Sequence, residues 1–302
     1  MSISIFPMTQ TFAAEIGDVD LVNTSSEDLA AVRQAFSRYA VLVFPAQELS
    51  AQQHVNFAAH FGPLERTVSA TFRDHKLRLP EEVSDIANLQ GDGRIWSATS
   101  RIRQFQLGNR IWHTDSSFKA PSGYASLLYA RTVAPIGGHT QFADMRAAYD
   151  ALAGGMKARL EGLKGEHSLL FSRARLGFDN FTEDERVAFS PVIRPLVRTL
   201  PENNRPSLYV ASHIGRIHGM SNSDALKLVD ELIAHATQAQ FVYTHRWRVG
   251  DLVMWDNRCT MHRGTDFEDT RWVRDLQRVT TSDRSDAFGV AEASRPDVAA
   301  SY

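Results

Sequence analysis

Trp112-His113-Thr114-Asp115-Ser116-Ser117-Phe118 contains a His-x-Asp motif around which the rest of the chain is arranged. In a β-strand, residues two apart point to the same face. His113 and Asp115 can therefore direct an imidazole nitrogen and a carboxylate oxygen at one point, which suits a single divalent metal ion. The tripeptide alone is not specific, because a chain with 11 histidines can place one there by chance. The alternative is a surface histidine beside a solvated aspartate.

A third ligand for such an ion is available far down the chain, at His262. The apolar run 252–255 predicts a buried strand after a turn at 249–251, and His262 follows this strand after a short polar link. Two histidines and one carboxylate leave three coordination positions open, which is the usual arrangement in non-haem Fe(II) oxygenases. Zinc prefers closed sites with nitrogen and sulfur ligands, and the single cysteine, Cys259, cannot build one.

Four motifs follow one another along the chain. They are Gly108-Asn109-x-x-Trp112-His113-x-Asp115-Ser-x-Phe118, Gly137-Gly138-His-Thr140-x-Phe142-Ala143-Asp144-Met145, Trp255-Asp256-Asn257-Arg258-x-x-x-His262-Arg263, and the pair Arg274 and Arg278. In this order they resemble the motifs of the taurine dioxygenase and dichlorophenoxyacetate dioxygenase family, and the resemblance runs from about 12 to 281. It implies an enzyme that uses Fe(II), 2-oxoglutarate and O2, with His113, Asp115 and His262 as metal ligands.

The resemblance also assigns residues to 2-oxoglutarate. The far carboxylate of this cosubstrate needs a cation at a fixed distance from the metal, and the planar fork of arginine suits it. By resemblance Arg274 is this cation, and the Thr140 hydroxyl donates a second hydrogen bond to the same carboxylate. The spacing from His262 to Arg274 is one residue longer than the family usually has. Arg271 is a rival by proximity, but Arg274 and Arg278 fit the family's Arg-x-x-x-Arg pattern better.

The second arginine of this pair, Arg278, indicates the charge of the substrate. On a strand it would share a face with Arg274, and two buried guanidiniums repel each other unless anions come between them. The resemblance implies that this second arginine pairs with an acid group near the active site, either on the substrate or on 2-oxoglutarate itself. We therefore predict a small anionic substrate, with Arg278 as the residue that binds it. The resemblance adds Asn109, His167 and His213 as residues that border the substrate. The alternative for each histidine is a structural hydrogen-bond donor between strands.

The predicted substrate class is an aryloxyalkanoate, because 142–152 and the surroundings of His167 and His213 look closer to the phenoxyacetate branch than to the sulfonate branch. Hydroxylation beside the ether oxygen would give a hemiacetal that releases a phenol and a 2-oxo acid, with succinate and CO2 as co-products. The alternatives are another carboxylate, such as an N-acyl amino acid, and a sulfonate. A metal-binding jelly roll without oxygenase activity is a further alternative, although it would have no use for Thr140 and Arg274.

The order of elements predicts a mainly β fold with helical additions, a cupin-like double-stranded β-helix or jelly roll. Alternating or apolar runs predict strands at 1–22 (a hairpin), 40–44, 83–89, 111–133, 192–198, 207–211, 241–247, 251–255 and 273–280. Helical spacing and capping patterns predict helices at 25–38, after a capping box at 24–27, and at 50–62, 144–152, 155–163, 223–237 and a short one from Thr182.

Length alone allows one large domain or two smaller ones, but no internal repeat or linker divides 1–281, which predicts one domain there. The small, polar residues of 282–302 predict a flexible tail. The chain has 302 residues, of which 43% are hydrophobic and 23% charged, and its net charge of -2 argues against a nucleic-acid or membrane partner. A single cysteine and the lack of a signal-peptide pattern at 1–17 fit the cytoplasm. The polar segment 64–108 is expected to supply a mobile lid. Family analogy favours a homo-oligomer.

Overall fold

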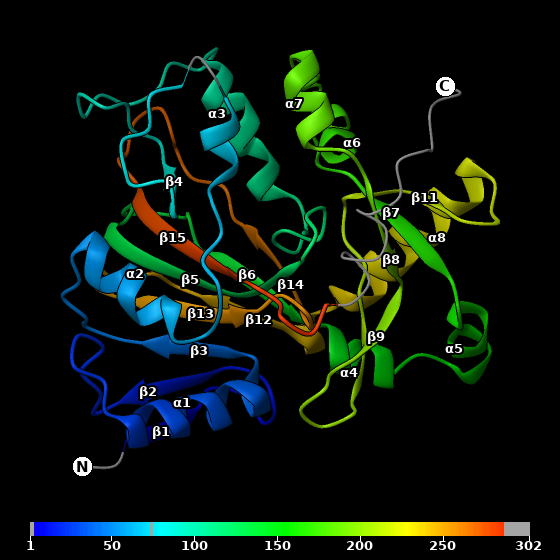
Figure 1. Ribbon diagram of the computed structural model, residues 1–302, viewed down its shortest axis with the longest axis horizontal. Helices are drawn as coiled ribbons and strands as arrows, with labels where there is room; N and C mark the ends of the chain where they lie inside the picture. Colours follow the sequence, from blue (N-terminus) through cyan, green and yellow to red (C-terminus); the bar gives the residue numbers. More distant parts are fainter. Residues whose placement is uncertain (1–2, 73–74, 287–302) are drawn as a thin grey trace.

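The computed structural model describes residues 3–72 and 75–286 of the chain. Its largest sheet has the strand order β1-β2-β3-β13-β5-β15-β4, so strands far apart in the sequence are neighbours in space (Figure 1). Only the β2–β3 pair in this sheet is parallel. The strands are β1 (Ser4–Pro7), β2 (Ala14–Gly17), β3 (Val41–Phe44), β4 (Val83–Ala87), β5 (Gly123–Thr132), β13 (Leu252–Asp256) and β15 (Asp275–Ser282).

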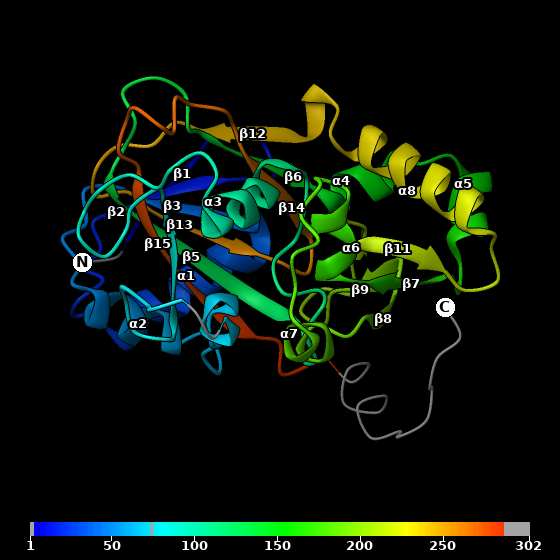
Figure 2. The ribbon, with the colours of Figure 1, turned by 90° about the horizontal axis from the view of Figure 1, so that it is seen from above.

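A smaller sheet packs against one face of the large one, as the view from above shows (Figure 2). Phe142 of the small sheet lies 5.4 Å from Trp255 of the large sheet, measured between ring centroids. The two sheets enclose a common core and form the predicted jelly roll with helical additions. The strands of the smaller sheet are, in spatial order, β12 (Val242–His245), β6 (Thr140–Asp144) and β14 (Thr260–Gly264).

The central strands are continuous apolar runs because both of their faces are buried. On β3, Leu42 and Phe44 pack into a core shared with two helices, whereas Val41 and Val43 face the small sheet. Alternation along the strand thus divides one apolar run between two cores. The helices that cover the outer face are α1 (Ser26–Tyr39) and α2 (Ala51–Ala59).

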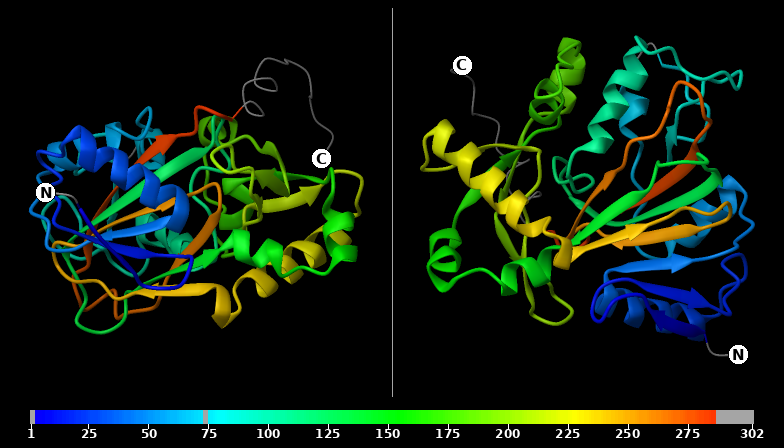
Figure 3. Two further views of the ribbon diagram at one scale, coloured as in Figure 1. Left: turned by 90° about the horizontal axis from the view of Figure 1, so that it is seen from below. Right: turned by 180° about the vertical axis from the view of Figure 1, so that it is seen from behind.

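The segment between β6 and β12 forms a second region beside the barrel, seen at the right of Figure 1 and from behind in Figure 3. Its sheet has the order β11-β7-β8, and Pro195 lies on the edge strand, as predicted. The strands are β7 (Lys164–His167), β8 (Val192–Pro195), β9 (Val197–Thr199), β10 (Pro206–Leu208) and β11 (Ile214–Ile217). The helices are α4 (Met145–Asp150), α5 (Gly154–Leu160), α6 (Leu169–Ala174), α7 (Glu183–Ala188) and α8 (Asn222–Ala236). Among the described residues, no helix combines the length and apolarity needed to cross a membrane.

Several predicted boundaries were wrong for local reasons. The predicted strand at 111–133 begins only at Gly123, because Ser116 has a positive φ of 56° and the chain turns there. The first helix is capped by Ser25, whose side chain accepts from the Asp28 amide, one residue later than the predicted capping box. The predicted strand at 192–198 is divided into β8 and β9. The elements that the sequence did not indicate are β6, β7, β11, β14, α6 and α3 (Arg101–Gln106).

Two segments that were predicted to be flexible contain packed or regular structure. Asp283 and Asp286 are buried and form ion pairs with Arg198 and Arg194, so the predicted tail is packed at its start, and 287–302 lie outside the described residues. Arg194 also donates to the backbone carbonyls of 117 and 119, just after the His-x-Asp motif. The segment 64–108 contains β4 and α3, and its closure as a lid stays a prediction.

Candidate metal centre

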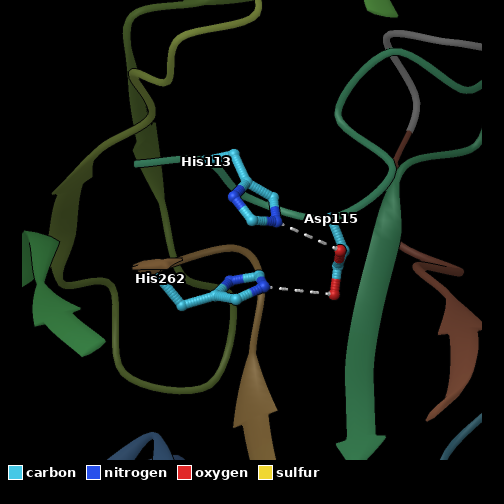
Figure 4. A group of neighbouring side chains, drawn as sticks. All are labelled: His113, Asp115 and His262. Atoms are coloured by element: carbon cyan, nitrogen blue, oxygen red, sulfur yellow. Dashed lines mark ion pairs between the residues drawn. The ribbon is translucent and has the colours of Figure 1, made fainter. Parts of the chain in front are cut away.

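The three predicted ligands meet between the two sheets. His262 lies on β14, whereas His113 and Asp115 lie on the segment that leads into β5. The backbones of His113 and His262 exchange two hydrogen bonds, with N···O distances of 3.0 and 2.7 Å. Both imidazoles face the carboxylate (Figure 4), with Nε2 of His113 3.9 Å and Nε2 of His262 3.7 Å from the nearer Asp115 oxygen. The three ligand atoms lie within 4.8 Å of one another.

These separations suit a shared metal ion better than direct hydrogen bonds, which are shorter. A metal ion that lies between two ligand atoms holds them farther apart than a direct hydrogen bond does. His113 Nδ1 lies 2.7 Å from the Ile111 carbonyl and donates to it, so Nε2 carries the lone pair that faces Asp115. The chemistry and spacing of the three side chains therefore fit one divalent cation.

The protonation states at this site also suit a cation. Burial lowers the pKa of His113 to about 4 and holds the pKa of His262 well below its usual value. Burial alone would raise the pKa of Asp115, but the charge of Arg278 and the two histidines lower it to about 2. At neutral pH the chain thus presents two neutral imidazoles and one carboxylate, so metal binding need not displace a proton.

His113 and Asp115 converge for a different reason from the one predicted. They do not share a strand face, because the chain turns at Ser116. The Thr114 hydroxyl instead donates to the backbone carbonyl of Asn257 at 2.7 Å, and the Asp115 amide donates to the Asn257 side-chain oxygen at 3.2 Å. Asn257 therefore fixes the turn that brings the carboxylate beside the histidines.

Two further side chains orient the Asp115 carboxylate. Ser126 of β5 donates to one oxygen at 2.7 Å, and Arg278 of β15 donates to the other at 2.6 Å. We expected Arg278 to pair with a substrate anion, but its anionic partner in the chain is Asp115. Its Nε atom has no hydrogen-bond partner among the described residues.

Replacing Ser126 with alanine tests this support. We expect Fe(II) or Mn(II) affinity to fall roughly tenfold to a hundredfold, because one oxygen of Asp115 loses its donor. Calorimetric titration of the metal-free protein measures the change. Ser190→Ala, at an exposed position after α7, is the matched control. Equal affinities for the two variants would mean that the Ser126 hydroxyl does not orient the ligand.

A cavity of about 370 Å³ connects the two histidines with Thr140 and Arg274. The Thr140 hydroxyl accepts a hydrogen bond from the Trp247 indole at 3.0 Å, which leaves its own proton free to donate. Arg274 precedes β15, and its Nε donates to the Gly138 carbonyl at 3.1 Å, the only hydrogen bond that the described residues give its guanidinium. Burial and the charge of Arg110 lower the pKa of Arg274 to about 10, so it is still a cation at neutral pH.

The Gly137-Gly138 motif allows this arrangement. Gly137 has a φ of +74°, and a Cβ atom there would lie 2.2 Å from the Asp266 carbonyl oxygen. Gly138 has a φ of +65°, and a Cβ atom there would lie 3.3 Å from the Arg274 side chain. Glycine at both positions therefore lets the loop pass close to Arg274 before β6 begins.

A larger cavity of about 760 Å³ adjoins the triad and is walled partly by aromatic and aliphatic side chains. Asn109 borders both cavities, and His213 borders the larger one, as the predictions for substrate contact require. The structure does not bring His167 to this cavity: its ring is buried and stacks on Tyr209 with centroids 5.5 Å apart. The cavity wall also includes Arg173, which sequence reasoning missed because no motif marks it.

Two histidines and one carboxylate on a jelly roll define the class of non-haem iron oxygenases. A family model described as "Taurine catabolism dioxygenase TauD, TfdA family" matches residues 4–280. The chain belongs to this family, and it is a non-haem iron dioxygenase that depends on 2-oxoglutarate.

Individual relatives cover nearly the whole chain. It is 41% identical to the alpha-ketoglutarate-dependent 2,4-dichlorophenoxyacetate dioxygenase of Cupriavidus pinatubonensis, over 94% of this chain and 99% of the relative. It is 35% identical to the (S)-phenoxypropionate/alpha-ketoglutarate-dioxygenase of Sphingobium herbicidovorans, over 89% and 92%. The crystal structure of AAD-2 in complex with Mn(II) and N-oxalylglycine aligns with a TM-score of 0.86 and 41% identity, over 95% and 98% of the two chains.

Proposed function

We propose that this chain hydroxylates an aryloxyalkanoate with Fe(II), 2-oxoglutarate and O2, and releases succinate and CO2. The observation that carries the proposal is the pair of cavities that share one triad. The smaller cavity ends at a cation and a free hydroxyl, which suits a dicarboxylate. The larger cavity is partly lined by aromatic side chains. The two relatives described above are named for 2,4-dichlorophenoxyacetate and (S)-phenoxypropionate, which supports an aryl ether as substrate.

In this proposal His113, Asp115 and His262 hold the iron, and Arg274 and Thr140 bind the far carboxylate of 2-oxoglutarate. The bound metal and its cosubstrate supply the oxidising chemistry. The residues fit this pair, because the cavity runs from the two histidines to the Arg274 guanidinium. N-oxalylglycine, present in the AAD-2 structure, differs from 2-oxoglutarate by an NH in place of a CH2.

The chain's own contribution is to position the substrate and to exclude water. Arg278 and Ser126 keep the Asp115 carboxylate in place, and Trp255, which is fully buried, packs 4.7 Å from the His262 ring. His213 and Phe118 both line the larger cavity, and their ring centroids lie 5.0 Å apart. We expect the aromatic part of the substrate to pack against the rings of His213 and Phe118.

The product of the proposed reaction breaks down without further catalysis. Hydroxylation replaces a C–H bond with a C–OH bond on the carbon that carries both the ether oxygen and the carboxylate. The resulting hemiacetal (a hemiketal from a 2-aryloxypropionate) loses its hydroxyl proton, and the bond between the hydroxylated carbon and the ether oxygen breaks. The aryloxy group takes up a proton and leaves as a phenol. The former hydroxyl becomes the keto group of a 2-oxo acid.

Succinate formation tests the proposal. Protein loaded with Fe(II) under anaerobic conditions is mixed with 2-oxoglutarate, O2 and a panel of aryloxyacetates, both enantiomers of aryloxypropionates, N-acyl amino acids and alkyl sulfonates. We expect equal amounts of succinate and free phenol from aryloxyalkanoates. If only the N-acyl amino acids or the alkyl sulfonates gave succinate, the substrate would belong to that class and not to the aryloxyalkanoates. Absence of the visible charge-transfer band of the Fe(II)–2-oxoglutarate complex would contradict the reaction itself.

The proposal includes the organisation of the protein: one catalytic domain over 1–281, a cytoplasmic location and a homo-oligomer. The continuous barrel built from both ends of this segment supports a single domain. Light scattering of the purified protein measures the oligomeric state.

A further inference from the structure

Arg173, on α6, is a buried cation of the larger cavity that has no acidic partner among the described residues. It is 4% exposed, its Nε atom has no hydrogen-bond partner, and its Nη1 atom makes one long contact of 3.4 Å with the Ser172 hydroxyl. The other cations that line the cavity are all ion-paired: Arg66 with Glu81, Lys119 with Glu65, and Arg278 with Asp115. A buried charge without a partner is costly, so Arg173 places an unpaired positive charge in the cavity wall that an anionic ligand would neutralise.

The Arg173 side chain is held in one position. Its guanidinium lies over the Phe105 ring, with Cζ 4.7 Å from the ring centroid. It also lies so close to Gly108 that a Cβ atom there would be 2.0 Å from Cζ and 2.1 Å from Nη1. Only glycine at 108 leaves room for the guanidinium, and this glycine begins the motif that contains the metal ligands. The position of the cation is therefore built into the site.

The neighbouring His213 is not equipped to donate to a carboxylate. The Ser172 hydroxyl donates to the Leu169 carbonyl at 2.9 Å, so its oxygen accepts from His213 Nδ1 at 2.8 Å. A neutral imidazole has a single N–H, and this contact places it on Nδ1. Its Nε2 atom is thus an acceptor, and it has no partner among the described residues. Arg173 is left as the donor for an anion in this part of the cavity.

Arg173 also lies within electrostatic range of the triad. Burial and the charge of Arg278 lower its pKa to about 10, whereas the charge of Asp115 opposes this shift. In an aryloxyacetate or a 2-aryloxypropionate, the carbon to be hydroxylated is bonded directly to the carboxylate carbon. A residue that binds this carboxylate must therefore line the same cavity as the metal ligands, as Arg173 does together with His113 and Asp115.

We propose that Arg173 binds the carboxylate of the substrate through its guanidinium fork and so places the adjacent C–H bond beside the metal. Arg278, which our sequence prediction favoured for this task, is engaged with Asp115 and positions that ligand instead. The inference rests on the proposed function and names the residue that selects for an acid.

The test compares an aryloxyacetate with its uncharged amide, which has nearly the same shape. In Arg173→Gln we expect the acid-over-amide ratio of kcat/KM to fall about tenfold to a hundredfold, because the charge-assisted hydrogen bonds to the carboxylate are lost. The affinity for 2-oxoglutarate, read from the anaerobic charge-transfer band, should not change. Arg175→Gln is the matched control. Arg175 is an exposed arginine at the C-terminal end of the same helix, and its side chain pairs with Asp230.

A second variant moves the guanidinium without removing it. Gly108→Ala places a methyl group where the guanidinium lies and should lower the same ratio. Gly155→Ala is its control, because a Cβ atom at 155 meets nothing within 4 Å. Arg173→Lys keeps the charge without the fork and should retain part of the preference for the acid.

The outcomes separate the inference from the proposed function. Equal losses for acid and amide, or an unchanged ratio in both Arg173→Gln and Gly108→Ala, would make Arg173 a packing residue and overturn the inference. If Arg173→Gln fails to form the Fe(II)–2-oxoglutarate complex, Gly108→Ala and Arg173→Lys decide. If the wild-type complex forms but turns over no aryloxyalkanoate, the proposed substrate class fails, and the carboxylate assignment fails with it.

Discussion

His262→Ala should lower turnover by at least about a thousandfold, because metal-assisted chemistry contributes several kcal/mol and the chain would retain only two of its three ligand atoms. The loss should appear both in succinate formation and in the iron that remains bound after dialysis. No other group replaces the ligand, since His113 and Asp115 are the only histidine, cysteine or acidic side chains that cluster with His262 in the described part of the chain.

His218→Ala is the control for this substitution, because His218 is an exposed histidine whose ring pairs with Glu166. It should retain both iron and activity. If His262→Ala kept wild-type iron content and turnover, the assignment of the metal centre would be wrong. A variant that lost iron but formed succinate at the normal rate would separate the metal from the reaction.

Arg274→Gln should raise the KM for 2-oxoglutarate by about a hundredfold, since removing one partner of a buried charge pair costs roughly 2–5 kcal/mol. The KM for the aryloxyalkanoate should change little, because Arg274 borders the smaller cavity and not the larger one. Titration of the anaerobic Fe(II) protein with 2-oxoglutarate measures the affinity directly through the charge-transfer band.

Arg271→Gln is the matched control for this second substitution. Arg271 is the rival that sequence spacing left open, and in the structure it is exposed and pairs with Glu268. We expect Arg271→Gln to bind 2-oxoglutarate as the wild type does. The opposite pattern, with a large loss only in Arg271→Gln, would exchange the two assignments.

The metal ligands could be predicted from the sequence because their motifs are short and chemically specific. His113 and Asp115 are two residues apart, and His262 follows one of the most apolar runs in the chain. The local geometry could not be predicted in the same way. The turn at Ser116 depends on hydrogen bonds to Asn257, which is more than 100 residues away in the sequence. Local strand propensity therefore could not predict it.

The residues around the substrate were harder to predict because their roles depend on burial. His167 and His213 look alike in sequence, yet only His213 borders the larger cavity. Arg173 belongs to no motif, and arginines are mostly exposed, but the structure buries it against Phe105 and Gly108. The partner of Arg278 was also unexpected, because a pairing between β15 and the loop at Asp115 exists only in the folded chain.

The ion pair between Arg194 and Asp286 makes the C-terminal segment part of the active site's support. Arg194 donates hydrogen bonds to the carbonyls of Ser117 and Lys119, which belong to the same loop as Asp115. Asp286 neutralises the buried charge of Arg194. A chain that a protease or a premature stop codon shortened before Asp286 would keep every metal ligand and every residue of both cavities. It would nevertheless leave Arg194 buried without an anion and loosen the loop that borders the substrate. Loss of Asp286 is therefore expected to lower catalysis although it removes no ligand and no cavity residue.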